Sequence, residues 1–217
     1  MEQQAKRITQ QILQELAGRR PTEALSIPVG VSNRHVHLSR REMDLLFGYG
    51  SSLTRMKALR QPGHFAAQET VTLRGPKGEL QRVRVLGPLR RATQIEISVA
   101  DGFALGVNAP VRMSGELQDS PGVTLIGPHG QVEIQQGVIV AWRHIHISPE
   151  EAARHRLADG AEIAIATQGP RAGVLHHVKV RVSAEAVLEM HIDVEEANAL
   201  GLRNDDRVLA TTGAIRG

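Results

Sequence analysis

The sequence predicts a mainly β fold made of two related β-barrel domains capped by short helices. Short β-rich runs alternate with Gly-Pro turns along most of the chain, and two ten-residue stretches share six residues in the same positions. The phrase RHVHLS at residues 34–39 also returns as RHIHIS at residues 143–148. The two phrases lie about half of the 217-residue chain apart, which suggests an internal duplication.

Residues 1–20 are predicted to form an amphipathic helix that precedes the barrels. Its apolar residues recur at helical spacing and form one stripe: Ala5, Ile8, Ile12, Leu13 and Leu16. Gly18 and Pro21 end the helix, and residues 21–26 form a short linker. Such a helix can pack on its own domain or dock into a groove of another protein.

The rest of the chain is predicted to consist mainly of strands. VTLRGPKGEL (71–80) and VTLIGPHGQV (123–132) share the pattern Val-Thr-Leu-x-Gly-Pro-x-Gly, which predicts two matching hairpins. Other strands are predicted in IPVGV (27–31), RVRVLGP (82–88), TQIEIS (93–98), GVIVAW (137–142), AEIAIAT (161–167) and VKVRVS (178–183).

The two phrases predict pairs of histidines on one face of a strand. Residues two apart in a strand point the same way, so His35 and His37 can converge on one metal ion while their apolar neighbours face the core. His144 and His146 repeat the arrangement. A single His-x-His pair is often only exposed or hydrogen-bonded, so the metal prediction rests on the duplication.

Three capping boxes predict helices directly after the strands that carry these residues. They are Ser39 to Glu42, Ser148 to Glu151 and Asp193 to Glu196. Pro149 stands at the favoured first position of the second helix. The histidines are therefore expected at strand ends, where side chains meet a cleft.

Two further residues can complete the metal sites. Glu96 in TQIEIS and His191 in EMHIDVEEA give one set of two histidines and a glutamate and one set of three histidines. Both sets resemble zinc sites with an open fourth position. The chain has no cysteine, so only nitrogen and oxygen ligands are available, and these also allow iron, manganese or nickel.

Composition narrows the functional classes. A net charge of +3 with few aromatic residues argues against nucleic-acid binding, whereas it suits a small anionic ligand. Arg90, after a Gly-Pro turn, can hold a phosphate or carboxylate with two hydrogen bonds. No apolar stretch predicts a membrane span and the N-terminus lacks a secretory signal, so a cytoplasmic location is expected.

Six motifs in order closely resemble the PduL-type phosphotransacylases, also called phosphate propanoyltransferases. The motifs are GVSNRHVHLS, QPGHFAAQETVTLRGPKG, VLGPLR, TQIEIS, RHIHISPEEA and LEMHIDVEEANALGL, and the resemblance runs from about Ile27 to the C-terminus. It implies an enzyme that interconverts acyl-CoA plus phosphate with acyl phosphate plus CoA, in the lumen of a bacterial microcompartment. Propanediol degradation with a propanoyl substrate is the expected setting.

The resemblance also implies the site. One zinc would be bound by His35, His37 and Glu96, and the other by His144, His146 and His191. Arg90 would bind the phosphate. The residues that would contact CoA are Val31, Ser32, Asn33, Lys77, Arg84 and Asn198.

The implied domains are discontinuous. One barrel would combine residues 27–33 with 142–217, and the other would span residues 34–141. Residues 1–20 match the family's encapsulation peptide, which implies shell or cargo proteins of the microcompartment as partners. The acyl-chain preference and the oligomeric state, a homo-oligomer included, stay open.

The absence of cysteine excludes a cysteinyl intermediate, so direct attack of phosphate on the thioester is the simplest route. Two alternatives remain. A cupin-like metal enzyme also uses His-x-His on a β-barrel, but Glu42 lies too far after His37 for the usual cupin spacing. A non-catalytic, metal-stabilised cargo or scaffold protein would use the same residues without turnover.

Overall fold

The computed structural model describes residues 25–210, and in this range the chain is mainly β, as predicted. The predicted helix over residues 1–20 lies outside the described part. None of the helices between residues 25 and 210 combines the length and the apolar character needed to cross a lipid bilayer.

Every strand predicted above from the β-rich runs is present. The strands are β1 (Ser26–Ser32), β2 (His35–His37), β3 (Arg55–Ala58), β4 (Phe65–Arg74), β5 (Glu79–Gly87), β6 (Gln94–Glu96), β7 (Val111–Arg112), β8 (Thr124–Ile126), β9 (Gln131–Glu133), β10 (Val138–Ala141), β11 (His144–Ile147), β12 (Glu162–Ala166), β13 (Val174–Val182), β14 (Glu189–Asp193) and β15 (Arg207–Ala210). The helices are short: α2 (Arg40–Phe47), α3 (Val99–Leu105), α4 (Pro149–His155) and α5 (Val194–Leu200).

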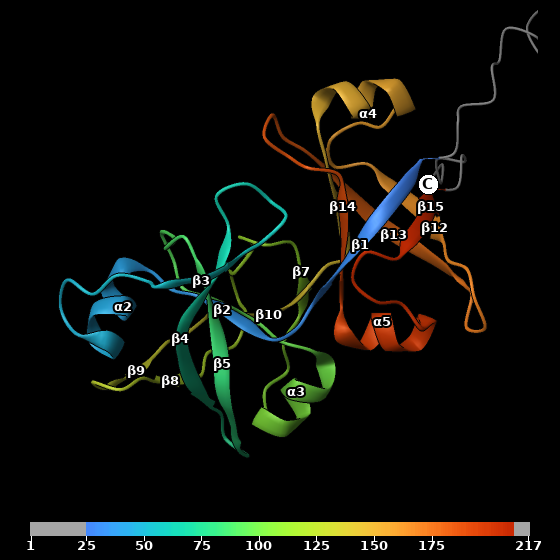
Figure 1. Cartoon of the computed structure of the whole chain (residues 1–217). Coiled ribbons are helices and arrows are strands. Elements are labelled where there is room, and N and C mark those ends of the chain that lie inside the picture. Colours follow the sequence, from blue (N-terminus) through green and yellow to red (C-terminus); the bar gives the residue numbers. More distant parts are fainter. Residues whose placement is uncertain (1–24, 211–217) are drawn as a thin grey trace, which may run out of the picture.

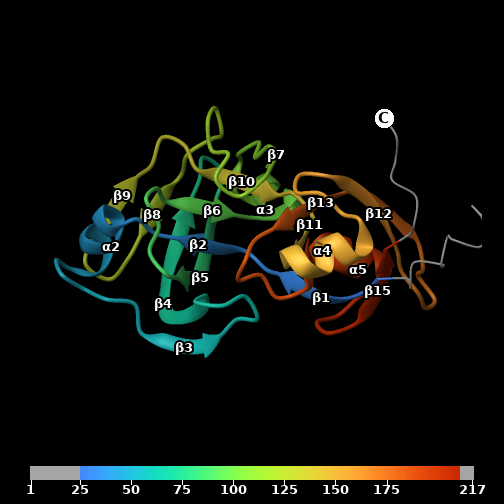
Figure 2. The ribbon, with the colours of Figure 1, turned by 90° about the horizontal axis from the view of Figure 1, so that it is seen from above.

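The strands form two lobes that lie side by side (Figures 1 and 2). One lobe is a closed barrel in the order β1-β14-β11-β13-β12-β15. The other is an open sheet in the order β7-β10-β6-β2-β5-β4-β8-β9, with β3 paired to β4. The fold class is therefore confirmed, with closure complete in only one of the two lobes of the described chain.

The two lobes exchange the strand that precedes each histidine phrase. β1 comes just before β2 but pairs with β14 and β15 in the closed barrel, where its blue ribbon lies among red strands in Figure 1. β10 comes just before β11 but pairs with β6 and β7 in the open sheet. Each phrase is therefore reached through a strand that belongs to the opposite lobe.

Burial follows this exchange. Ile27 and Val29 of β1 pack in the core of the closed barrel, together with Ile145 and Ile147. Val138 of β10 packs in the separate core of the open sheet. Alternation along each strand explains the pattern, because every second side chain points inward.

The shared Gly-Pro-x-Gly stretches form the predicted hairpin turns, and each turn also donates a hydrogen bond to the C-terminal turn of a helix. The backbone N–H of Lys77 donates to the carbonyl of Leu105 in the last turn of α3, and that of His129 donates to Leu46 in α2, both at 3.0 Å. A Cβ at Gly75 would come within 2.2 Å of the Leu105 oxygen. Glycine is needed at position 75 because the backbone of the turn lies directly against the helix backbone at Leu105.

The arginine that begins each histidine phrase forms an ion pair with the first turn of a helix that carries a complete capping box. Arg34 pairs with Asp101 of α3 at 2.7 Å, and Arg143 pairs with Glu196 of α5 at 3.2 Å. Asp101 and Glu196 are the acidic members of complete capping boxes with Ser98 and Asp193. The predicted box from Asp193 to Glu196 is thus confirmed.

The predicted box at Ser39 is wrong in its hydrogen bonds, although α2 begins there. The Ser39 side chain caps no backbone N–H; its hydroxyl donates to the buried carboxylate of Glu42. Thr93, distant in sequence, donates to the same carboxylate at 2.8 Å. Thr93 Oγ1 also accepts from the backbone N–H of Ser39 at 2.9 Å, which is the bond that Glu42 was predicted to accept. The predicted box at Ser148 is half formed: Ser148 Oγ accepts from the backbone N–H of Glu151, but the Glu151 side chain bonds to the Ser148 hydroxyl rather than to its backbone.

Candidate metal centre

Backbone register brings the first ligand set together at the edge of the open sheet. β2 and β6 are antiparallel, and His35 stands opposite Glu96. His35 Nε2 lies 3.3 Å from Glu96 Oε2, and His37 Nε2 lies 4.0 Å from Glu96 Oε1. The three side chains offer ligand atoms that all lie within 4.8 Å of one another. The apolar residues that follow the two histidines, Val36 and Leu38, are buried as predicted.

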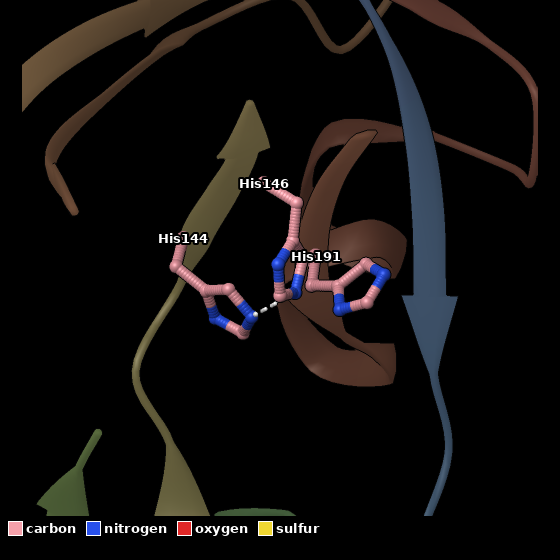
Figure 3. A group of neighbouring side chains, drawn as sticks. All are labelled: His144, His146 and His191. Carbon is pink, nitrogen blue, oxygen red and sulfur yellow. Dashed lines mark hydrogen bonds between the residues drawn. The ribbon is translucent and has the colours of Figure 1, made fainter. Parts of the chain in front are cut away.

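The second ligand set repeats this register in the closed barrel. β11 and β14 are antiparallel, and His144 stands opposite His191. His144 Nε2 and His146 Nε2 are 3.1 Å apart, and the ring of His191 faces both (Figure 3). Their ligand atoms also lie within 4.8 Å of one another.

Equivalent hydrogen bonds orient the first histidine of each set. His35 Nδ1 lies 2.8 Å from the carbonyl oxygen of Asn33, and His144 Nδ1 lies 2.7 Å from that of Trp142. In both cases the carbonyl belongs to the residue two positions earlier. An imidazole that donates from Nδ1 presents its Nε2 lone pair, which is the usual arrangement of metal-binding histidines.

Burial sets the protonation of the three-histidine set. Loss of solvent, with the charge of neighbouring imidazoles adding to it, lowers the pKa of His144 to about 4 and the pKa of His146 to about 2. Both rings are therefore neutral at pH 7. A neutral imidazole is the form that binds a metal ion.

The set with the glutamate behaves differently. Burial lowers the pKa of His37 to about 3. Burial also opposes a charge on His35, but the Glu96 carboxylate outweighs this and raises the pKa of His35. Burial likewise opposes ionisation of Glu96, yet the charge of His35 holds the Glu96 pKa well below its usual range. Glu96 therefore stabilises a positive charge on the neighbouring His35 ring.

One atom of the first set also fits a bound cation. Among buried side-chain polar atoms in residues 25–210, only His37 Nδ1 has no hydrogen-bond partner. A buried ring nitrogen without a partner is costly, and an ion bound at Nδ1 of His37 would remove this cost. Two compact sets built from imidazoles and one carboxylate, with three ligands per set and no sulfur, match zinc-type ligand chemistry.

Both sets open into one cavity of about 1030 Å³ between the lobes. Arg90 lines it, and its Nη1 donates to Ser114 Oγ at 2.9 Å. Burial lowers the pKa of Arg90, against the attraction of Glu96. The cavity thus combines two candidate metal sites with a partly desolvated guanidinium, a combination suited to anionic oxygens.

The structure brings only some of the predicted CoA contacts to this cavity. Val31 and Ser32 line it, and Asn33 lines a small adjacent pocket. Arg84 Nη1 is turned to the carbonyls of Ala67 and Gln68. The other two residues lie outside the cavity lining: Lys77 on the hairpin turn and Asn198 on the exposed side of α5.

Sequence reasoning missed several cavity residues. Arg181 lines the cavity and stands opposite His146 in the parallel pair of β13 and β11. Alternation along VKVRVS marks a strand, but it cannot say which strand lies beside it. Ser114, Gln94 and Glu189 also line the cavity and were missed for the same reason.

Comparison with known proteins agrees with this geometry. The sequence model of the phosphate propanoyltransferase family matches residues 28–203. The chain is 59% identical over 199 residues to a phosphate propanoyltransferase of Rhodobacter capsulatus, which covers 92% of this chain and 93% of that protein.

Two further relatives are phosphate propanoyltransferases as well. The chain is 59% identical over 193 residues to a phosphate propanoyltransferase of Rhodopseudomonas palustris, covering 89% of this chain and 85% of the relative. It is 50% identical over 183 residues to one of Thermotoga maritima, covering 84% and 87%. The chain therefore belongs to the phosphate propanoyltransferase family of acyltransferases.

Proposed function

We propose that this chain interconverts a short-chain acyl-CoA, propanoyl-CoA by preference, and phosphate with the acyl phosphate and CoA. The observation that carries the proposal is the opening of both ligand sets and of Arg90 into one cavity. A thioester and a phosphate must meet in such a reaction, and a shared cavity allows both to be held in contact.

Two zinc ions would be held by the two ligand sets. His35, His37 and Glu96 would bind one ion, and His144, His146 and His191 would bind the other. When bound, zinc supplies a Lewis acid that can polarise a carbonyl oxygen or stabilise a thiolate.

Arg90 would bind and orient the phosphate. A phosphate oxygen attacks the thioester carbonyl carbon, the C–S bond breaks, and CoA leaves as a thiolate that then takes up a proton. Ser114, which accepts from Arg90 Nη1, keeps the guanidinium aimed at the cavity. Holding the dianion beside the carbonyl lowers the barrier through proximity and through neutralised repulsion.

CoA would extend from the cavity along the strand end that carries Val31, Ser32 and Asn33. Lys77, Arg84 and Asn198 would contact its distal part. All three lie outside the cavity lining, which suits a long ligand whose reactive end alone enters the site.

The domain division and the location are part of the proposal. Sheet membership supports a barrel made of residues 27–33 with 142–217 and a second unit over residues 34–141. Residues 1–20 would direct the enzyme into the lumen of a bacterial microcompartment by binding shell or cargo proteins there.

The test is thioester formation from CoA and propanoyl phosphate by the purified full chain, before and after chelation and with zinc restored. Activity that disappears with the chelator and returns with zinc is expected. Arg90→Ala should raise the KM for phosphate in the reverse direction by about 10 to 100-fold, the cost of one charged hydrogen-bond donor. Arg74→Ala, which removes an exposed arginine paired with Glu79, is the matched control. Unchanged phosphate dependence in Arg90→Ala would remove Arg90 from this role.

A further inference from the structure

The residue two positions before the third ligand occupies an equivalent place in both lobes. In the open sheet, Gln94 stands opposite His37 across the antiparallel pair of β2 and β6. In the closed barrel, Glu189 stands opposite His146 across β11 and β14. Both side chains are buried, with 1% and 7% of their surface exposed, and both contact the third ligand of their set.

Gln94 faces its ligand as a donor. Its Nε2 donates to Glu96 Oε1 at 2.6 Å and to Ser114 Oγ at 2.9 Å. Its Oε1 accepts from the backbone N–H of Gly115 at 2.8 Å. A backbone N–H can only donate, so this bond fixes the orientation of the amide and turns the NH₂ group toward the carboxylate.

Glu189 faces its ligand as an acceptor. Its Oε2 lies 2.9 Å from His191 Nε2 and accepts from Gln61 Nε2 at 3.0 Å. Gln61 is itself oriented by Val187, whose carbonyl accepts from the same Nε2 at 2.9 Å. Hydrogen bonds from Gln61 and His191 hold the Glu189 pKa below its usual value, although burial opposes this.

This bond decides which nitrogen His191 presents. Nε2 is engaged by Glu189, so Nδ1 is left for an ion. Figure 3 shows one ring nitrogen of His191 turned toward the other two imidazoles and the other turned away. His144 and His146 instead bring their Nε2 atoms together.

Gly30 leaves room for this carboxylate. It stands opposite His191 in the parallel pair of β1 and β14. A Cβ at this position would come within 2.6 Å of Glu189 Oε1 and 3.0 Å of His191 Cδ2. The exchanged strand therefore carries the one residue type that lets Glu189 lie against the ring.

We infer that Gln94 and Glu189 are positioning residues whose chemistry is matched to the third ligand: an amide donor for the carboxylate Glu96, and a carboxylate acceptor for the imidazole of His191. The inference rests on the proposed binding of metal by these two sets. Outer partners of this kind fix the orientation of a ligand, and an acceptor such as Glu189 also raises the basicity of its imidazole. Losing one costs about 10 to 100-fold in metal affinity.

The experiment measures zinc affinity at both sites of the full chain by competition with a chromophoric chelator, using zinc alone. Glu189→Ala should weaken one of two bound zinc ions by about 10 to 100-fold and leave the other unchanged. Glu189→Gln keeps an acceptor oxygen but loses the charge, so its loss should be smaller. Gln94→Ala should weaken the opposite ion. Glu185→Gln removes an exposed carboxylate four residues from Glu189 and should change neither affinity.

Two results would overturn the inference. Unchanged affinities in both alanine variants would show that the ligands need no such support, and equal weakening of both ions in each variant would indicate a general structural role. If Glu189→Ala does not fold, the isosteric Glu189→Gln supplies the same comparison. A wild-type chain that binds no zinc would instead refute the proposed metal sites themselves, and with them the inference.

Discussion

The two ligand sets share one backbone arrangement but differ in charge. In each, a His-x-His strand pairs in the same antiparallel register with the strand that carries the third residue, yet this residue is Glu96 in one lobe and His191 in the other. A cation held by the first set keeps one positive charge less than the same cation held by the second. The three-histidine site is therefore the stronger attractor for an anion, and the duplication offers two unequal positions.

The pKa values reflect the same asymmetry. The carboxylate of Glu96 raises the pKa of His35, whereas burial and the neighbouring imidazoles lower the pKa of its counterpart His144 to about 4. His35 therefore accommodates a positive charge without metal, whereas burial keeps its counterpart His144 neutral at pH 7. Neighbouring residues supply this difference, because the backbone register is the same.

Removing one ligand from each set should have the largest effect. His35→Ala and His144→Ala should each release a single zinc ion, a different one in each case. Each should reduce acyl transfer by more than about 100-fold, since loss of an outer partner alone costs up to that much. Metal analysis and turnover of both variants would check this. Retention of two tightly bound ions in either variant would contradict the ligand assignment.

The strand exchange predicts that a core substitution in β1 destabilises the closed barrel, although β1 is followed in sequence by the open sheet. Ile27 is fully buried in the closed barrel although it precedes the histidine phrase of the open sheet. Ile27→Ala should lower the free energy of unfolding by about 2–5 kcal/mol. Hydrogen exchange should show the loss of protection in β14 and β15 before β5. Val36→Ala, in the other core, should reverse that order.

Converting one set into the other would sharpen the comparison. Glu96→His alone places an imidazole against the amide donor of Gln94, so zinc affinity at that site should fall by about 10-fold or more. Adding Gln94→Glu supplies the acceptor that the closed barrel uses and should restore part of the affinity. Chelator competition on the single and double variants would decide, and a double variant no better than the single one would argue against matched partners.

Removing the arginine of either histidine phrase should have the smallest effect, and the loss of stability should be similar in both lobes. Arg34 and Arg143 each form a partly exposed ion pair with the capping acid of a helix. Arg34→Ala and Arg143→Ala should each lower the free energy of unfolding by about 1 kcal/mol or less. Urea denaturation of both variants would measure this, and a loss of several kcal/mol in one alone would break the equivalence of the lobes.

Much of the fold was predictable because its signals are local. The period of two in the histidine phrases placed Val36 and Ile145 in the two cores, and the repeated Gly-Pro-x-Gly stretches gave both hairpins. The box at Asp193 held since both of its partners lie within one helix turn.

The rest depends on contacts between distant segments. Nothing in the spacing of IPVGV or GVIVAW says that these strands pair in the opposite lobe. Thr93 takes the Ser39 backbone N–H that Glu42 was predicted to bind, and Gln61 contacts Glu189 across the two lobes. The sequence shows that a polar residue stands near a ligand along the chain, but it does not show where the side chain of that residue points. The prediction for residues 1–20 lies beyond the described chain and stays a prediction.

The exchanged strands have a consequence for descent. Gly30 lies five residues before His35 and pairs with His191, and Ile139 lies five before His144 and pairs with Glu96. A half-length chain with this topology would lack one strand, and two copies would complete each other as a swapped dimer. In a single chain the two halves need not share one sequence, so one site can carry a glutamate while its counterpart carries a third histidine.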